Sequence, residues 1–172
     1  MLKEVVGNLV LDEQYKIFCH QTNCKGVMGS GIAKQIANMF PAVQMRNKDY
    51  CKRPNILGTF LAVRVSPTRI CVNLYGQDGY GRQGCYTDYD ALKQALNKLA
   101  AALENVPQEW KIGFPYRMSC GLGGGSWTKV YPLIAEFANK VKQDVYIVKL
   151  KGVHDGEDKQ EVKRTYYRVR ER

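Results

Sequence analysis

The fold is decided by one stretch of the sequence, residues 19–33, which read Cys-His-Gln-Thr-Asn-Cys-Lys-Gly-Val-Met-Gly-Ser-Gly-Ile-Ala. Residues 16–20, which overlap its start, have the apolar composition of a short strand. Beyond its glycines, Ile32, Ile36 and Met39 follow the three- and four-residue spacing of one apolar helix face. Glycine admits positive φ and lets backbone N–H groups approach a ligand closely. The stretch therefore predicts a strand, a glycine-rich loop and a helix in succession.

The same succession occurs twice more along the chain. Most of the 16 glycines fall in three clusters, at residues 26–31, 76–84 and 121–125, each between an expected strand and an expected helix. Periodicity and turn signals predict strands at residues 5–11, 16–20, 59–65, 69–75, 111–115 and 145–150, and helices at residues 30–40, 42–51, 87–103 and 127–140. This alternation predicts an α/β fold, with three α/β/α layers around a central mixed, mostly parallel sheet of about six strands. Ligands bind such sheets beyond the carboxyl ends of the strands.

The charge is carried mainly by the body of the chain. The 172 residues fit one domain and include 26 basic and 16 acidic side chains, a net charge of +10. Residues 151–172 hold seven basic and five acidic side chains, so this segment contributes +2 and the rest of the chain +8. We therefore expect a domain at residues 1–150 and a charged extension at residues 151–172, either an added strand or partly disordered. The charge of the domain itself suggests an anionic partner.

Composition excludes several classes of protein. No stretch approaches the roughly 20 uncharged apolar residues of a membrane span, and the N-terminus lacks the apolar core of a secretion signal. Because no export signal is seen and six cysteines are too few for a disulfide scaffold, we expect a cytoplasmic protein with reduced cysteines. None of the six forms a Cys-x-x-Cys pair. No metal site and no cofactor are expected. Cys19 and His20 are adjacent on a strand and point to opposite faces, which makes them unsuited to bind one metal ion together with Cys24.

The glycine clusters do not match two common nucleotide-binding motifs. A dinucleotide-binding loop would have a third glycine where this chain has Lys34, and an acid at the end of the next strand. A P-loop would continue after residues 121–125 with Gly-Lys-Ser/Thr, which this chain lacks. Two loops from separate strand–helix units can instead hold a pyrophosphate between them, because helix N-termini offer N–H donors to phosphate. The alternatives are a plain tight turn for the first loop and a flexible connector for the last.

Two long motifs, in the right order and spacing, resemble those of the macrodomain family. Residues 19–33 resemble its Asn-x-x-Gly-x-Met-Gly-x-Gly-Ile-Ala segment, and residues 119–127 resemble its second phosphate loop with the helix that follows. Residues 7–9, Gly-Asn-Leu, resemble the Gly-Asp-Ile after its first strand, and the likeness extends over residues 5–150. The motifs look closest to the branch of ADP-ribose 1″-phosphate phosphatases, protein-ADP-ribose glutamate hydrolases and DNA-ADP-ribose hydrolases. Many short phage and bacterial macrodomains look similar.

The resemblance implies a ligand, ADP-ribose or ADP-ribose 1″-phosphate, and a role for each matching residue. Asn8 stands where the family's aspartate accepts from the adenine amino group, which an asparagine oxygen can also do, and Leu9 is expected to touch the adenine ring. Asn23 is expected to hydrogen-bond the distal ribose, and Tyr75 to close the pocket at a strand end. Phosphate contacts are expected from two loops, which comprise Gly29, Ser30, Gly31 and Ile32 in one, and Gly121, Leu122, Gly123, Gly124, Gly125 and Ser126 in the other.

The resemblance also disfavours one catalytic mechanism. The lysine-dependent hydrolases of the family use a lysine after the fourth strand, and one type adds an aspartate in the second loop, whereas the matching positions here are Gln77 and Gly123. Neither can act as a lysine nucleophile or a carboxylate base. We expect His20, Asn23 and Asp78 to be the catalytic residues, with His20 as general acid or base near neutral pH. The alternatives are that His20 is structural and that Asp78 is a turn residue.

Three functions follow from these observations. The chain is expected to bind ADP-ribose and to hydrolyse an ADP-ribose derivative without a metal, as an ADP-ribose 1″-phosphate phosphatase or a mono-ADP-ribosyl hydrolase. The first alternative is a module that reads ADP-ribose without turnover. The second is a basic nucleic-acid-binding domain, whose binding would fall steeply with ionic strength. ADP-ribosylated proteins or nucleic acids are further expected partners, and the protein is expected to be a monomer.

Overall fold

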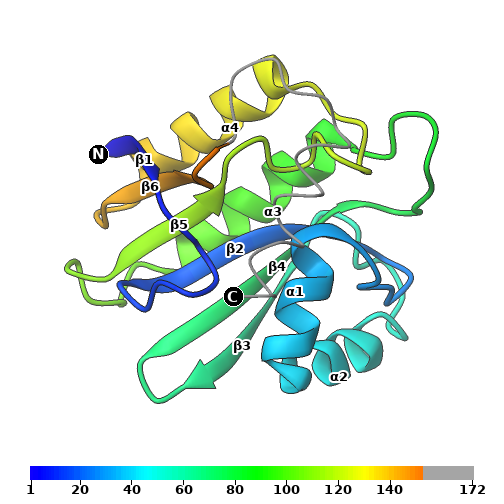
Figure 1. The fold of residues 1–172 in the computed structure, drawn as a ribbon, viewed down its shortest axis with the longest axis horizontal. Coiled ribbons are helices and arrows are strands. Elements are labelled where there is room, and N and C mark those ends of the chain that lie inside the picture. Colours follow the sequence, from blue (N-terminus) through cyan, green and yellow to red (C-terminus); the bar gives the residue numbers. More distant parts are fainter. Residues whose placement is uncertain (153–172) are drawn as a thin grey trace.

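The structure, a computed structural model, describes residues 1–152, so the predicted extension at residues 151–172 lies outside the described residues apart from its start. Strands and helices alternate as the sequence predicts (Figure 1). In chain order the elements are β1 (Leu2–Val6), β2 (Tyr15–Asn23), α1 (Gly31–Met39), α2 (Pro41–Tyr50), β3 (Phe60–Ser66), β4 (Arg69–Gln77), α3 (Tyr89–Ala102), β5 (Lys111–Pro115), α4 (Trp127–Lys140) and β6 (Val145–Lys149).

The strands of residues 1–152 form one sheet of six, in the order β1-β6-β5-β2-β4-β3. β1 pairs parallel with β6, β6 with β5, β5 with β2 and β2 with β4, and the edge pairing of β3 with β4 is antiparallel. This confirms the predicted mixed, mostly parallel sheet. Because β2, β4 and β5 are parallel neighbours, their carboxyl ends meet at one edge of the sheet, and a glycine cluster follows each of them.

Helices cover both faces of the sheet, which confirms the three-layer arrangement. α1 and α2 lie on one face, and α3 and α4 lie on the other (Figure 1). The first pair covers a core cluster that contains Phe18 and Ile36, and the second pair covers a cluster that contains Ile17 and Ile134. Ile17 and Phe18 are neighbours on β2 and enter different clusters, because successive side chains of a strand point to opposite faces.

The helix N-termini differ in how their backbone N–H groups are satisfied. α3 has a side-chain cap: Asp88 Oδ1 accepts a hydrogen bond from the Ala91 N–H at 2.9 Å. Ser30 before α1 and Ser126 before α4 make no side-chain cap hydrogen bond, and neither helix has an acidic residue in its first turn. The first N–H groups of α1 and α4 are therefore left without a side-chain acceptor.

The predicted strand at residues 5–11 is wrong in its position. β1 ends at Val6, and the chain then turns, because Asn8 Oδ1 accepts from the N–H groups of Val10 at 3.2 Å and Leu11 at 3.1 Å. A short polar side chain that bonds its own backbone competes with strand pairing in this way. The strands β2 and β4 extend beyond the predicted ends, to Asn23 and Gln77, and bring polar side chains to the edge of the sheet.

A buried arginine fixes the segment between β1 and β2. The Arg69 guanidinium donates to the carbonyls of Leu9, Val10 and Tyr15 at 2.7 to 2.9 Å and lies over the Phe18 ring at 4.2 Å. Only 5% of Arg69 is exposed, so these carbonyls replace water as partners of its N–H groups. The segment that carries Asn8 and Leu9 is thereby held against β4.

Candidate functional site

A cavity of about 920 Å³ lies at the carboxyl ends of β2, β4 and β5. Its volume is in the range of small-molecule sites. All three glycine clusters contribute to its wall. Its lining includes His20, Gln21, Asn23, Gly29, Ser30, Gly31, Ile32, Gln77, Tyr80, Arg82, Gly84, Ser119, Gly121, Leu122 and Gly123. The structure thus brings together most of the loop residues that the sequence predicts.

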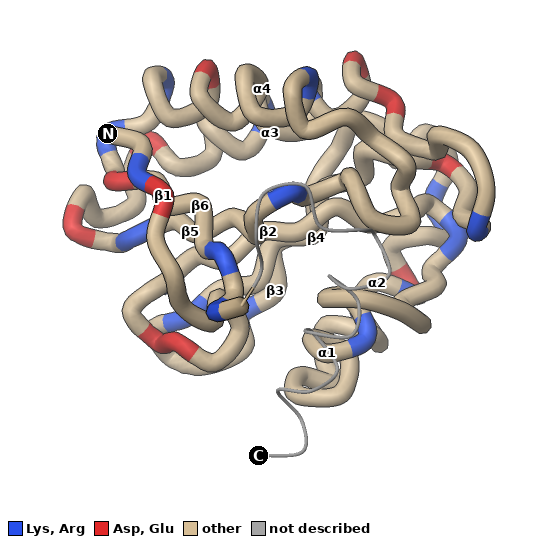
Figure 2. Tube along the Cα trace, turned by 45° about the horizontal axis from the view of Figure 1, so that its top comes forward, with Lys and Arg blue, Asp and Glu red and all other residues tan. Residues whose placement is uncertain are grey.

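The cavity wall offers positive charge and backbone donors to an anion. Among residues 1–152, the ionic side chains that line the cavity are Arg82 and Arg117. The open N-terminus of α1 also faces it, through Ser30, Gly31 and Ile32. Elsewhere Lys and Arg are spread over many elements, with Asp and Glu between them (Figure 2). The positive net charge is therefore not gathered at the cavity.

His20 lies in the cavity wall but is fully buried, and it is neutral at pH 7. Burial lowers its pKa to about 4, only partly offset by the hydrogen bond from Nε2 to Asn73 Oδ1 at 2.6 Å. The expectation of a histidine that titrates near neutrality is wrong for this physical reason. Asn73 Nδ2 donates to Asn47 Oδ1, which turns Asn73 Oδ1 toward the ring. Nε2 then carries the proton, and Nδ1 is an acceptor with no hydrogen-bond partner among the described residues.

Asn23 is committed mainly to its own loop. Its Oδ1 accepts from the N–H groups of Lys25 at 3.0 Å and Val27 at 3.3 Å, and its Nδ2 donates to the Val27 carbonyl at 2.8 Å. These bonds fold the segment between β2 and α1 back toward the cavity. An amide nitrogen has two hydrogens, so Nδ2 keeps a second one for a ligand.

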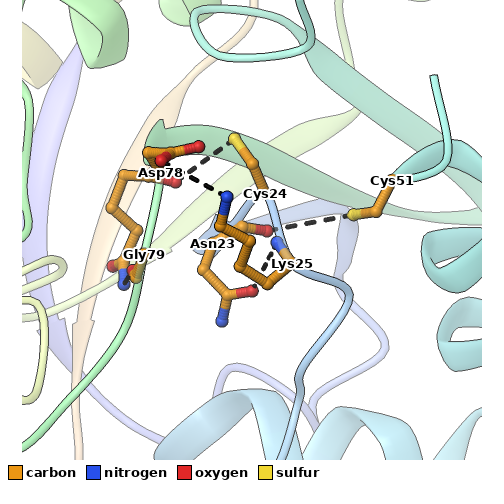
Figure 3. A network of polar contacts seen from close by, with 7 residues as sticks. Asn23, Cys24, Lys25, Cys51, Asp78 and Gly79 are labelled. Atoms are coloured by element: carbon orange, nitrogen blue, oxygen red, sulfur yellow. Dashed lines mark hydrogen bonds and ion pairs between the residues drawn. The ribbon is translucent and has the colours of Figure 1, made fainter. Parts of the chain in front are cut away.

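The structure does not bring Asp78 into the cavity wall. Its carboxylate pairs with Lys25 Nζ at 3.4 Å (Figure 3). Its backbone carbonyl accepts a hydrogen bond from the Cys24 N–H at 3.0 Å. Both contacts tie the end of β4 to the loop after β2. Cys24 Sγ donates to the Gln77 carbonyl in the same network. Burial, followed by the charge of Asp78, raises the pKa of the Cys24 thiol to about 11, so this cysteine is not a thiolate nucleophile at pH 7.

Three other predicted contact residues lie away from the cavity wall. Tyr75 does not close the pocket: it is fully buried, its hydroxyl donates to Asn47 Oδ1 at 2.7 Å, and its ring stacks on Tyr50. The reason is that β4 continues for two residues past it. Asn8 uses its Oδ1 within its own turn and Leu9 is buried in the core, and neither lines the cavity.

The last glycine cluster divides into a lining part and a supporting part. Gly121, Leu122 and Gly123 line the cavity, whereas residues 124–126 do not. Gly124 has a φ of +68°, and a Cβ there would overlap the Gly84 carbonyl. The Gly123 carbonyl accepts from the N–H groups of residues 86 and 87, at 2.8 and 3.0 Å. The second and third glycine clusters are therefore packed backbone to backbone.

Sequence reasoning missed a chain of polar side chains in the same wall. Gln21 Nε2 donates to Gln77 Oε1 at 2.8 Å and to Thr87 Oγ1 at 3.0 Å, and Ser119 Oγ donates to Gln21 Oε1 at 2.7 Å. A Cβ on Gly123 would lie 2.7 Å from the Ser119 carbonyl oxygen and 3.1 Å from Gln77 Oε1. The structure therefore has no room for an aspartate at position 123, which agrees with the lack of one in the sequence.

The described part of the chain shows neither a metal-binding cluster nor a membrane-spanning helix. Within residues 1–152, no three His, Cys, Asp or Glu side chains are grouped so that they could hold a metal ion. None of the helices described there has the length and apolar character needed to cross a bilayer.

No protein-family model matches the sequence. An uncharacterized 17.5 kDa protein from the tk-vs intergenic region of Enterobacteria phage T4 is 26% identical over 148 residues, covering 83% of this chain and 93% of the phage protein. The ADP-ribose 1″-phosphate phosphatase of Saccharomyces cerevisiae is 23% identical over 170 residues, covering 83% of this chain and 96% of the yeast protein.

Solved structures share the topology over most of the chain. The macrodomain of Mycobacterium tuberculosis DarG superposes with a TM-score of 0.72 at 19% identity, covering 87% of this chain and 97% of that one. Thermosipho africanus DarTG, solved in complex with ADP-ribose, superposes with a TM-score of 0.72 at 18% identity, covering 95% of this chain and 44% of that one. The six-stranded mixed sheet, its two helical layers and these superpositions lead to one conclusion: the chain has the macrodomain fold.

Proposed function

We propose that this chain binds ADP-ribose in the cavity and hydrolyses a derivative of it. The observation that carries the proposal is the uncapped N-terminus of α1, which faces a cavity whose ionic side chains are arginines. A phosphate there would gain several N–H donors and the positive end of the helix dipole. The relative in yeast is an ADP-ribose 1″-phosphate phosphatase, and one protein of the same fold was solved with ADP-ribose.

In this proposal the pyrophosphate lies between the two lining loops. Residues 29–32 bind one phosphate and residues 121–123 bind the other through backbone N–H groups. Residues 124–126 support the second loop from behind. Asn23 donates its second Nδ2 hydrogen to the distal ribose, and the segment with Asn8 and Leu9 borders the adenine. For Asn23 and the two loops this orientation is supported by the cavity lining, and for Asn8 and Leu9, which do not line the cavity, it is supported by the position of their motif alone.

The catalytic part of the proposal uses His20 as an acceptor. Nδ1 carries a lone pair that no described residue uses, and we assign it to accept a hydrogen bond from the attacking water, which must reach this buried atom from the cavity that His20 borders. The water oxygen bonds to the 1″ centre, the bond from that centre to the leaving group breaks, and a proton passes through His20 to the leaving group. Asn23 positions the ribose. Asp78 acts through Lys25 and the loop after β2 rather than on the water, since its carboxylate faces Lys25.

One variant tests the phosphate site directly. Ser30→Asp places a carboxylate at the cap of α1, which should satisfy the helix N-terminus and repel a phosphate at the same time. We expect the affinity for ADP-ribose, measured by calorimetry, to fall on the order of 100-fold, while the unfolding midpoint stays equal or rises. Asn38→Asp adds the same charge to an exposed position of the same helix and should leave the affinity unchanged. Unaltered binding by Ser30→Asp would sink the proposal.

Turnover is tested with ADP-ribose 1″-phosphate as substrate and free phosphate as the readout. His20→Ala should abolish phosphate release while leaving ADP-ribose binding within a few-fold of the wild type. Full turnover by this variant would remove His20 from the mechanism.

A module that binds ADP-ribose without turnover is the second candidate. The observations that favour it are the neutral state of His20, the ion pair that draws Asp78 away, and an uncharged glutamine at position 77. Binding without phosphate release by the wild type would establish it. Several expectations stay predictions. These are the cytoplasmic location, the monomeric state, a phage or bacterial origin, the absence of a metal from the reaction and a separate extension at residues 151–172. Binding of ADP-ribosylated proteins or nucleic acids also stays a prediction.

A further inference from the structure

Ser119 stands where the backbone favours glycine. Its φ is +70°, in the left-handed region that L side chains rarely adopt. It lies in the loop between β5 and α4, lines the cavity, and is followed within six positions by four glycines. The chain thus uses a serine at a position where glycine would relieve strain. Strain of this kind at a cavity wall calls for a role of the side chain.

A chain of hydrogen bonds runs from Gln77 through Gln21 to Ser119, and the bond of Gln77 to the Gly79 carbonyl determines which group donates in each of the others. Gln77 Nε2 donates to the Gly79 carbonyl at 2.9 Å, and a carbonyl can only accept. Gln77 therefore turns Oε1 toward Gln21, which must donate to it through Nε2, at 2.8 Å. Gln21 then has Oε1 left for Ser119, and Ser119 Oγ donates to it at 2.7 Å.

This chain of bonds determines what Ser119 can offer to a ligand. A hydroxyl has one hydrogen, and that of Ser119 is already given to Gln21. Its two lone pairs can only accept. A pyrophosphate oxygen is also an acceptor, so Ser119 cannot serve the phosphates. The partner must be a donor, and a ribose hydroxyl is the donor that a nucleotide sugar provides.

We infer that Ser119 Oγ accepts a hydrogen bond from a hydroxyl of the distal ribose, and that Gln21 is a positioning residue that keeps Ser119 an acceptor. The inference rests on the proposed function. Gln21 is two positions before Asn23 on β2, and Asn23 is the residue assigned to that ribose, so Ser119, which is bonded to Gln21, is placed at the ribose end of the cavity. All three residues line the cavity.

Two ligands and two variants test the role of Ser119. ADP-ribose and ADP share the adenosine diphosphate part, and only ADP-ribose has the distal ribose. Ser119→Gly and Ser119→Ala should each weaken ADP-ribose binding by about five-fold, the effect of one lost hydrogen bond, and leave ADP binding unchanged. Ser119→Gly should also fold with an equal or higher unfolding midpoint, because glycine adopts this φ without strain. Agreement between the two variants separates loss of the hydroxyl from a change in backbone freedom.

The positioning role of Gln21 is tested by a double-mutant cycle. Gln21→Leu should lower the affinity for ADP-ribose relative to ADP in the wild-type background. In the Ser119→Ala background it should cost no further affinity, because Gln21 acts through the missing hydroxyl. Additive losses would show that Gln21 acts on its own and would overturn its assignment.

The outcomes separate this inference from the proposed function. If the wild type binds no ADP-ribose, both are overturned. If the wild type binds ADP-ribose and both Ser119 variants bind it equally well, only the inference is overturned. An equal loss for ADP-ribose and ADP would also overturn it, because the contact would then lie on the shared part of the ligand or on the loop itself.

Discussion

Two polar networks lie on opposite faces of the sheet at the base of the cavity, and they differ in how completely their atoms are paired. On the α3 side, Gln77, Gln21 and Ser119 form a chain in which the side-chain nitrogens and oxygens all have partners. On the α2 side, Asn73 and Tyr75 both donate to Asn47 Oδ1, while His20 Nδ1 and Asn47 Nδ2 have no hydrogen-bond partner within residues 1–152. Adjacent residues of β2, His20 and Gln21, belong to different networks because their side chains alternate between faces.

This difference in pairing means that the buried polar side chains of the two networks have different effects. When the donor and acceptor of every hydrogen bond in a chain are fixed, the last side chain is kept as a donor or as an acceptor, and Ser119 is kept as an acceptor in this way. A network with unpaired atoms costs stability, and such atoms call for an explanation such as a bound group or a catalytic role. Asn47, Asn73 and Tyr75 of the α2-side network are fully buried and do not line the cavity, whereas Gln21 and Ser119 are half-buried at the cavity and can reach water. Breaking the two networks should therefore have unequal costs.

The largest effect is expected from Asn47→Leu, which removes the acceptor of the enclosed network. Asn73 Nδ2 and the Tyr75 hydroxyl would be left buried without a partner, and each such group costs about 1–3 kcal/mol. We expect the free energy of unfolding, measured with urea, to fall by about 3 kcal/mol or more. Asn97→Leu, on an exposed position of α3, is the control and should change it by about 0.5 kcal/mol or less. A small effect at Asn47 would mean that water enters this network.

A comparable effect is expected when His20 titrates. Its folded pKa, about 4, lies below the value of 6.5 for an exposed histidine. Between these two pH values the unfolded chain binds a proton that the folded protein does not. The contribution of His20 to stability is therefore present above pH 6.5 and is lost as the pH falls toward 4, by about 3 kcal/mol in total. Urea unfolding at a series of pH values measures the loss, and His20→Gln should show a smaller one.

The smallest effect is expected from Gln21→Leu, in the network that borders the cavity. The released atoms of Gln77 and Ser119 line the cavity, so water can replace the lost bonds. The free energy of unfolding should fall by only about 1 kcal/mol. A loss as large as that of Asn47→Leu would show that the two networks are equally enclosed and would remove the distinction drawn between them.

The fold and the lining loops could be predicted from the sequence to a large extent. The strand at residues 111–115 and the helix at residues 127–140 match the structure, because their apolar periodicity is strong and their ends are marked by turns. The first strand was misplaced because the turn after it depends on one side-chain oxygen, that of Asn8. Propensity alone does not reveal such a bond.

The side-chain networks could not be predicted, for a different reason. Gln21 and Ser119 lie 98 positions apart, and Gln21 and Gln77 lie 56 apart. Periodicity and motif spacing describe neighbours along the chain, and they contain no information on which distant polar side chains will meet. The same limit applies to His20, whose pKa depends on burial that only the folded sheet provides. Loops that bind through the backbone are visible in a sequence as glycines, whereas side-chain partnerships are not.

The pairing of β1 with β6 has a consequence for when the sheet is completed during synthesis of the protein. Leu2 lies beside Val145 and Val6 beside Lys149, and within residues 1–152 no other strand is a neighbour of β1. During synthesis, β1 must therefore wait for β6, which is made much later, before it can enter the sheet. Contacts of such high sequence separation form late and slowly. The segment proposed to border the adenine follows directly after β1, so the earliest-made part of the binding site should be among the last to become functional.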